Sequence, residues 1–147
     1  MFERVVAAVD WSEQSERALE AATELARLSG GEVRLLHVHE VERLPPQGSG
    51  PLATSMEAAA GPGEKEAAER LKVASQQIAA AGIKVSSEVR VSLSGRVAVE
   101  IAEEVTAWGA DAVVIGSRGL TNLAGIILGS TTHKLLHLAT VPVVVVR

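Results

Sequence analysis

Apolar residues follow two alternating patterns along this chain. Nearly continuous apolar runs occupy residues 2–9, 33–38, 112–115 and 141–146, and residues 83–93 alternate between apolar and polar positions. Short runs of this kind are typical of strands, and continuous ones are typical of parallel strands covered on both faces. The pattern therefore predicts five strands.

Between these runs, apolar residues recur at helical spacing. Start signals at Ser12 and a stop at Ser29, Gly30 and Gly31 delimit the first predicted helix, and further helices are predicted over residues 64–81, 97–108 and 133–139. Strands that alternate with helices indicate a parallel sheet with right-handed crossovers. We expect a single α/β domain over residues 1–147.

Residues 44–63 break the alternation. They hold four of the five prolines and show little periodicity. We predict a mobile surface loop with a short helical piece near residues 55–60.

Three glycines after the fourth predicted strand form the most distinctive pattern. Gly116, Gly119 and Gly129 give the spacing G-x2-G-x9-G, and Ser130, Thr131 and Thr132 follow at the start of the last predicted helix. Glycine permits positive φ and close approach of the backbone to a ligand. With Ser130 or a neighbouring threonine capping the helix, its remaining N–H groups would attract an anion, most naturally a phosphate.

Ordinary turn and cap chemistry explains any one of these glycines equally well. The three together, after a buried strand, favour a ligand. Open α/β sheets bind ligands beyond the carboxyl ends of their strands, where the strand order reverses. Because Asp10 ends the first strand and the glycines follow the fourth, one pocket can use both only if these strands are neighbours, which predicts an open five-stranded sheet of order 3-2-1-4-5 with helices on both faces.

Composition excludes several classes of function. The net charge is −4, the 14 lysines and arginines are scattered, and aromatic residues make up only 2%, which argues against nucleic-acid binding. There is no cysteine for thiol chemistry, no apolar run long enough to span a bilayer and no signal-peptide pattern, so we expect a cytoplasmic protein without a membrane partner. The sequence lacks the P-loop and the hydrolase-elbow motifs.

The glycine spacing, the opening V-V-A-A-V-D-W-S, the central L-L-H-V and the closing V-P-V-V-V-V resemble the universal stress protein family, in particular its ATP-binding branch. The resemblance covers nearly the whole chain. It implies a Rossmann-like fold of the adenine nucleotide alpha hydrolase type, a role in the stress response, and ATP as cofactor, with Mg²⁺ bound through the phosphates. The ATP contacts that it implies fall on Ala8, Asp10, Val38, Gly116, Arg118, Gly119, Gly129, Ser130 and Thr131.

Two of these positions carry alternatives. Asp10 suits a ribose hydroxyl or a phosphate-bound Mg²⁺, and from the residues alone it is equally a cap of the first helix. Trp11 follows where the family more usually has a small residue or phenylalanine, and it either covers the site or covers the core.

Histidine pairs offer a metal-site alternative. His133 and His137 have helical i, i+4 spacing, and His37 and His39 share one face of a strand, but no carboxylate or cysteine stands at a matching position. We therefore interpret them as surface or partly buried histidines.

The leading functional hypothesis is an ATP-binding regulatory module that works by binding rather than by turnover. No pair of base and nucleophile is evident, so at most slow ATP hydrolysis or autophosphorylation on Ser130, Thr131 or Thr132 is expected. A dimeric interaction module without nucleotide is the third hypothesis. By the predicted order residues 141–146 form an edge strand, which we expect to pair with its counterpart in a homodimer, as the resemblance also implies.

Overall fold

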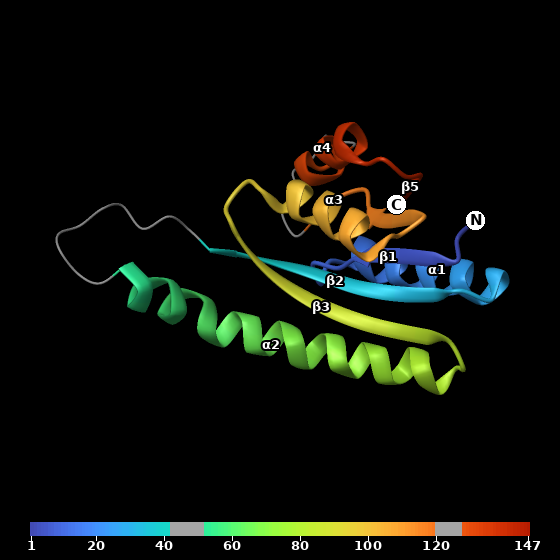
Figure 1. The fold of residues 1–147 in the computed structure, drawn as a ribbon, viewed down its shortest axis with the longest axis horizontal. Helices are drawn as coiled ribbons and strands as arrows, with labels where there is room; N and C mark the ends of the chain where they lie inside the picture. The colour runs from blue at the N-terminus through green and yellow to red at the C-terminus, as the bar shows by residue number, and fades with distance from the viewer. Residues whose placement is uncertain (42–51, 120–127) are drawn as a thin grey trace.

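In the computed structural model the chain forms one parallel sheet of five strands (Figure 1). The structure describes residues 1–41, 52–119 and 128–147, and for residues 52–62 it describes the backbone only. The strands are β1 (Arg4–Ala8), β2 (Glu32–Val41), β3 (Lys84–Leu93), β4 (Ala112–Gly116) and β5 (Val143–Val146). Their order is β3-β2-β1-β4-β5, which confirms the predicted topology.

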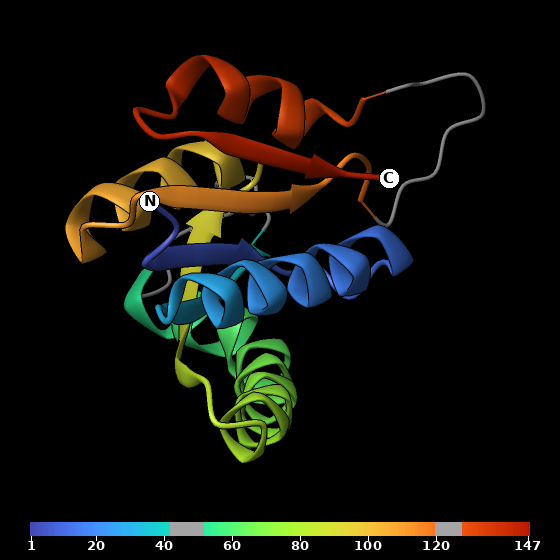
Figure 2. The same ribbon diagram turned by 90° about the vertical axis from the view of Figure 1, so that its right-hand side faces the viewer.

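Within the described residues, four helices cover both faces of this sheet (Figures 1 and 2). They are α1 (Glu13–Ser29), α2 (Leu52–Ala80), α3 (Val97–Trp108) and α4 (Ser130–Leu138). Helices α1 and α2 lie on one face, and α3 and α4 lie on the other. The predicted α/β layering is therefore confirmed.

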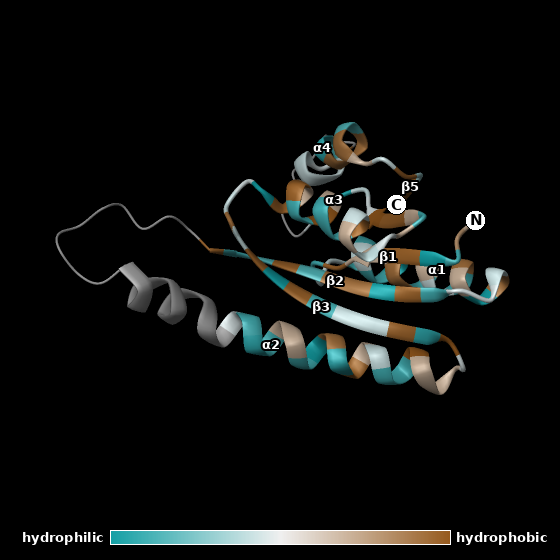
Figure 3. Cartoon of the chain, in the orientation of Figure 1, coloured by the Kyte–Doolittle hydropathy of each residue, from teal (hydrophilic) through white to brown (hydrophobic). Residues whose placement is uncertain are grey.

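The core consists of two apolar layers that share the central strands. In β1, Val5 and Ala7 face α1 and α2, while Val6 and Ala8 face α3 and α4, because successive side chains of a strand point to opposite faces. All four are buried, and β1 is coloured as hydrophobic along most of its length in Figure 3. This two-sided burial explains the continuous apolar run in the sequence.

Short signals in the sequence set several helix ends. The side chain of Ser12 accepts a hydrogen bond from the Ser15 N–H and so caps α1. Gly30 and Gly109 end α1 and α3 in the left-handed conformation, which glycine adopts without steric cost. The start at Ser12 and the stop at Gly30 were both predicted.

Other boundaries differ from the prediction. Strand β2 continues to Val41 instead of ending at residue 38, because it stays paired with β3 as far as Val41 opposite Leu93. Residues 52–63 form the first turns of α2, so the predicted helical piece near residues 55–60 is confirmed, and the predicted loop is wrong for residues 52–54 and 61–63. Residues 58–60 are alanines and join the strongly helix-forming stretch that follows, so helix propensity outweighs the local glycines and proline. Residues 44–51 lie outside the described part of the chain.

Candidate functional site

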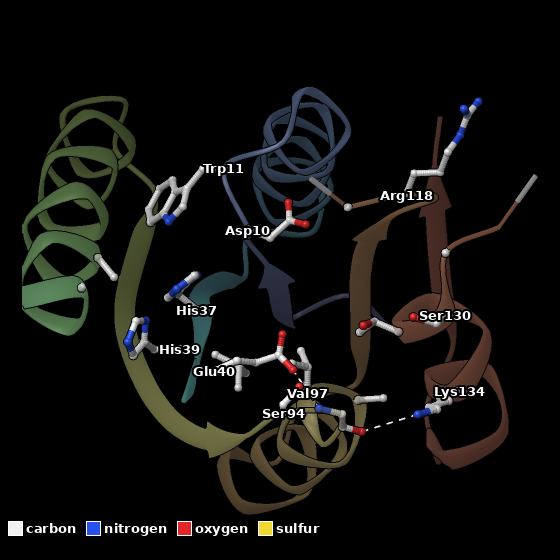
Figure 4. Close-up of a pocket in the computed structure, with 18 of the residues that line it drawn as sticks. Asp10, Trp11, His37, His39, Glu40, Ser94, Val97, Arg118, Ser130 and Lys134 are labelled. Atoms are coloured by element: carbon white, nitrogen blue, oxygen red, sulfur yellow. Dashed lines mark hydrogen bonds between the residues drawn. The ribbon is translucent and has the colours of Figure 1, made fainter. Parts of the chain in front are cut away.

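A cavity of about 900 Å³ opens at the carboxyl ends of the strands (Figure 4). The predicted site residues that line it are Asp10, Val38, Arg118, Gly119, Gly129, Ser130 and Thr131. The other two, Ala8 and Gly116, line a smaller hollow of about 130 Å³ together with Asp10, Val38 and Gly119. The fold thus brings all nine predicted residues to one place, because β1 and β4 are neighbours.

Asp10 lies just beyond β1, and its two carboxylate oxygens have different surroundings. Its Oδ1 atom accepts hydrogen bonds from the N–H and the hydroxyl of Ser12, at 3.0 and 2.5 Å. Ser12, not Asp10, is the cap of α1, so Asp10 holds the cap in place. Its Oδ2 atom faces Gly119. The alternative that Asp10 caps α1 is therefore wrong: one of its oxygens supports the Ser12 cap, and the other points toward Gly119.

The glycines are required for close packing rather than for positive φ. A Cβ on Gly119 would lie 2.6 Å from Oδ2 of Asp10. A Cβ on Gly116 would lie 2.9 Å from the backbone carbon of Gln14, where α1 crosses β4. Neither glycine has positive φ, and Gly129 has φ −68°. The expectation of positive φ was wrong. Glycine is favoured at Gly116 and Gly119 because a Cβ there would come too close to Gln14 and to the Asp10 carboxylate.

The first turn of α4 presents its N–H groups without a side-chain cap. Gly129 occupies the N-cap position, and no side chain of the described residues caps the helix. The expected cap by Ser130 or a neighbouring threonine is thus wrong: the cap residue is a glycine, and the Thr132 hydroxyl donates to the Gly116 carbonyl at 2.8 Å. Ser130 and Thr131 line the cavity. This helix end is suited to bind an anion.

Arg118 lines the cavity differently from what its charge suggests. Its side chain extends away from the centre of the cavity in Figure 4. Its main chain lies beside Gly129, since a Cβ on Gly129 would be 3.4 Å from the Arg118 Cα. We therefore assign the cavity contact of Arg118 to its backbone.

Several residues that line the cavity were not predicted. Glu40 accepts a hydrogen bond from the Gly95 N–H at 2.9 Å, and the Lys134 ammonium lies 3.5 Å from the Gly95 carbonyl (Figure 4). Glu40 was not predicted because the predicted second strand stopped at residue 38. The available signal was its spacing, since Glu40 follows Val38 by two residues and lies on the same face of β2. Lys134 follows Ser130 by one helical turn, and that spacing was the available signal.

The wall of the cavity opposite Ser130 consists of Trp11, His37 and His39 (Figure 4). Trp11 has φ +66°, which is unusual for a bulky residue, and its ring lies 5.5 Å from that of His37. Trp11 also packs against the core, so it takes both roles that the sequence left open. The His37 Nδ1–H donates to the Val9 carbonyl at 2.7 Å. Burial lowers the pKa of His37 below its usual value, so its ring is neutral at pH 7.

The histidine pairs are close, but they do not form a larger ligand cluster. The ring centres of His37 and His39 are 6.4 Å apart, and those of His133 and His137 are 4.9 Å apart. Within residues 1–41, 52–119 and 128–147 no three metal-binding side chains come together. In the same part of the chain, no helix combines the length and apolar character needed to cross a bilayer.

A family model for the universal stress protein family matches residues 1–147. This chain belongs to that family. Universal stress protein YxiE of Bacillus subtilis is 30% identical over 158 aligned positions that span both chains completely. The solved structure of MJ0577, a universal stress protein of Methanocaldococcus jannaschii, superposes with a TM-score of 0.79 at 28% identity and covers 99% of this chain and 96% of its own.

A further structure shares the fold with a nucleotide bound. The universal stress protein from Archaeoglobus fulgidus, solved in complex with dAMP, is 28% identical and has a TM-score of 0.63, with 98% of this chain and 96% of that chain covered. The family assignment and the Rossmann-type fold expected from the sequence are thereby confirmed for this universal stress protein.

Proposed function

We propose that this universal stress protein binds ATP in the cavity at the carboxyl ends of its strands and acts as a nucleotide-dependent regulatory module. The observation that carries the proposal is the uncapped start of α4 next to Gly119 and Asp10. A helix N-terminus without a side-chain cap supplies N–H donors for phosphate, and the carboxylate supplies an acceptor for a sugar hydroxyl.

Each part of the cavity suits one part of the nucleotide. Val38 and Val97 provide an apolar wall for adenine, and both line the two hollows. Asp10 accepts from ribose through Oδ2. The N–H groups of Ser130 and Thr131, with their hydroxyls, bind the outer phosphates. Bound Mg²⁺ would neutralise phosphate charge. Ala8 and Gly116 line the smaller hollow next to Asp10.

The relatives support an adenine nucleotide as the ligand class. The Archaeoglobus fulgidus protein was solved in complex with dAMP and covers nearly the whole of this chain. ATP and its Mg²⁺ are our extension of that observation. All nine residues that the sequence predicts as ATP contacts line the cavity or the smaller hollow beside it, which supports the extension.

Binding, and not turnover, fits the chemistry of the cavity wall. His37 uses its Nδ1–H on the Val9 carbonyl, and the Thr132 hydroxyl is buried and bonded to Gly116. Thr132 is therefore a poor site for autophosphorylation, while Ser130 and Thr131 remain the hydroxyls that line the cavity. Slow phosphate transfer to these two is the second candidate function.

We further propose that β5 mediates a homodimer. It is the last strand of the sheet, so one of its edges has no partner strand within the described fold. Its four valines are only half-buried. An exposed apolar edge is a template for pairing with another chain, and a second copy would remove it.

Thermal unfolding with ATP and Mg²⁺ tests nucleotide binding, with GTP as the specificity control. Protein is first freed of co-purified nucleotide by unfolding and ion exchange. At 100 times the dissociation constant the ligand stabilises by about 2.7 kcal/mol, and each kcal/mol raises the midpoint by roughly 2–4 °C at this size. We expect an ATP-selective rise of several degrees. No rise in stripped protein refutes the proposal.

A matched pair of variants at Ser130 tests the role of the helix end. Ser130 is the first helical residue, where proline is well tolerated, and the extended Gly129 suits the position before a proline. Ser130→Pro removes the N–H together with the hydroxyl, whereas Ser130→Ala removes the hydroxyl alone. Because a hydrogen bond to a charged group contributes about 1.5–3 kcal/mol, we expect Ser130→Pro to weaken ATP binding about tenfold or more. Equal affinity of the two variants would contradict the phosphate assignment.

A further inference from the structure

A second hollow, separate from the nucleotide cavity, runs between α1 and α2. We call it the α1–α2 groove, and its volume is about 850 Å³. Leu19 of α1 and Val73, Ala74 and Ile78 of α2 supply its apolar surface. Both helices lie on the same side of the sheet (Figure 2), and each packs mainly on strands.

The apolar surface of the groove is incompletely covered. Val73 is 53% exposed, although Ile78, from the same helix, is 7% exposed and belongs to the core. An apolar strip that continues from the core to the surface is typical of a site for another apolar element. We therefore expect the groove to bind an element that has one apolar face.

The rim of the groove is acidic. Glu16, Glu20 and Glu24 follow one another at intervals of four residues on α1, and Glu69 stands on α2. Glu24 forms an ion pair with Arg27, whereas the other three have no ion pair within the described residues. Among the described residues that line the groove, Arg70 is the single basic one. The charge of the rim thus favours a basic occupant.

The dimensions of the groove match a short helix. Residues 16–24 of α1 extend about 12 Å and residues 69–80 of α2 about 17 Å, at 1.5 Å per residue. A helix of two to three turns is about as long. Two flanking helices with an apolar floor between them form the usual receptor for an amphipathic helix, which inserts its apolar face and leaves its charged flanks at the rim.

We propose that the α1–α2 groove binds a basic amphipathic helix of a partner protein. The apolar face of that helix covers Leu19, Val73 and Ala74. Its lysines or arginines lie against Glu16, Glu20 and Glu69. This assigns a docking surface on the face of the sheet opposite α3 and α4.

The groove and the nucleotide cavity share a wall. Trp11 and Arg70 line both, and the Arg70 guanidinium lies 5.3 Å from the centre of the Trp11 ring. A ligand that moves either side chain changes both hollows. Coupling between nucleotide and partner follows from this shared wall and rests on the proposed function, whereas docking in the groove does not.

Fluorescence anisotropy with a synthetic peptide tests the docking site in the absence of nucleotide. The probe has about 15 residues, or roughly four helical turns, with leucines on one face and lysines on its flanks. One control peptide has the same composition in shuffled order, and another replaces lysine by glutamate. We expect saturable binding of the probe alone, weakened by salt.

Paired variants distinguish the groove from the rest of the surface. Val73→Lys places a charge on the apolar floor, and Leu28→Lys makes the same change at a 71% exposed leucine of α1 outside the lining. Glu20→Lys reverses a rim charge, and Glu88→Lys reverses an exposed charge on β3. We expect Val73→Lys to raise the Kd of the probe about tenfold and Glu20→Lys about fivefold, with the two controls unchanged.

Four results would overturn the docking site. Three concern the peptide: absence of saturable binding, equal binding of either control peptide, or unchanged affinity in Val73→Lys. The fourth is a change in oligomeric state of Val73→Lys by sedimentation, which would assign the groove to a second copy of this chain. Repeating the titration with saturating Mg²⁺ and ATP tests the coupling separately. An altered Kd supports the coupling, and an unchanged Kd refutes it while docking still stands.

Discussion

The contact between Gly119 and Asp10 gives the sharpest test of how the cavity is built. In Gly119→Ala the new Cβ would lie 2.6 Å from Oδ2, which is 0.8 Å short of the 3.4 Å at which ordinary contacts begin. The carboxylate must therefore move. Its Oδ1 atom is held by the Ser12 N–H and hydroxyl, and a movement of that size weakens both bonds.

The cost follows from those bonds. Hydrogen bonds to a charged group contribute about 1.5–3 kcal/mol each, so partial loss of two of them costs about 2 kcal/mol. We expect Gly119→Ala to lower the unfolding midpoint by roughly 4–8 °C. Asp10→Ala loses both bonds completely and should cost more, about 3–6 kcal/mol.

A double-mutant cycle isolates the clash. In the Asp10→Ala background the atom that Cβ would meet is absent, so Gly119→Ala should add almost nothing. Urea unfolding of the four proteins, followed by circular dichroism without nucleotide, should give an interaction energy of about 2 kcal/mol. Additive costs, within about 0.5 kcal/mol, would refute the proposed contact.

Three further predictions concern packing, pH and assembly. Gly116→Ala should destabilise by about 1–3 kcal/mol in urea unfolding, because its Cβ would lie 2.9 Å from Gln14, whereas Gly129→Ala, at 3.4 Å, should cost less than half as much; equal costs would contradict this role of Gly116. Burial, with a smaller contribution from His39 and Arg70, lowers the pKa of His37 in the folded state, so the unfolded chain takes up more protons and stability should fall as pH drops below about 6.5. In His37→Asn, urea titrations should show a smaller loss of unfolding free energy between pH 7.5 and 5.5 than in the wild type. An equal loss in the variant would contradict this role of His37. Val145→Pro should give a monomer in sedimentation with the fold intact. The carbonyls of Pro142 and Val146 accept from Val113 of β4 and from Ser117 just after it, so the N–H of Val145, between them, points outward, and a persisting dimer would refute pairing through β5.

Much of the fold could be predicted because local rules and burial agree along most of the chain. The continuous apolar run of β1 reflects burial on both faces, and Ser12 and Gly30 mark α1 through capping chemistry. Boundaries that depend on pairing or on competing propensities could not be predicted. Strand β2 extends past Val38 because β3 accompanies it, and α2 begins at Leu52 despite nearby glycines and a proline.

The candidate site divides in the same way. The glycine spacing and Asp10 could be recognised because they form a motif along the sequence. Glu40, Lys134 and Arg70 carry no motif and reach the cavity only through the packing of β2, α4 and α2. The α1–α2 groove had no signal in the sequence, because its lining comes from two helices whose residues are far apart along the chain.

The sequence by itself determined the strands, the helices and the residue types near the cavity, since apolar periodicity and turn chemistry act locally. The order of the strands followed from the requirement that Asp10 and the glycines share one pocket. Only the tertiary structure decided what the glycines do. Gly116 and Gly119 are constrained by atoms of Gln14 and Asp10, and these contacts exist only after α1 has packed across β1 and β4. Tertiary packing likewise made Gly129 the cap of α4 and directed the Thr132 hydroxyl to Gly116, because a hydroxyl bonds to whichever acceptor the folded chain brings nearest.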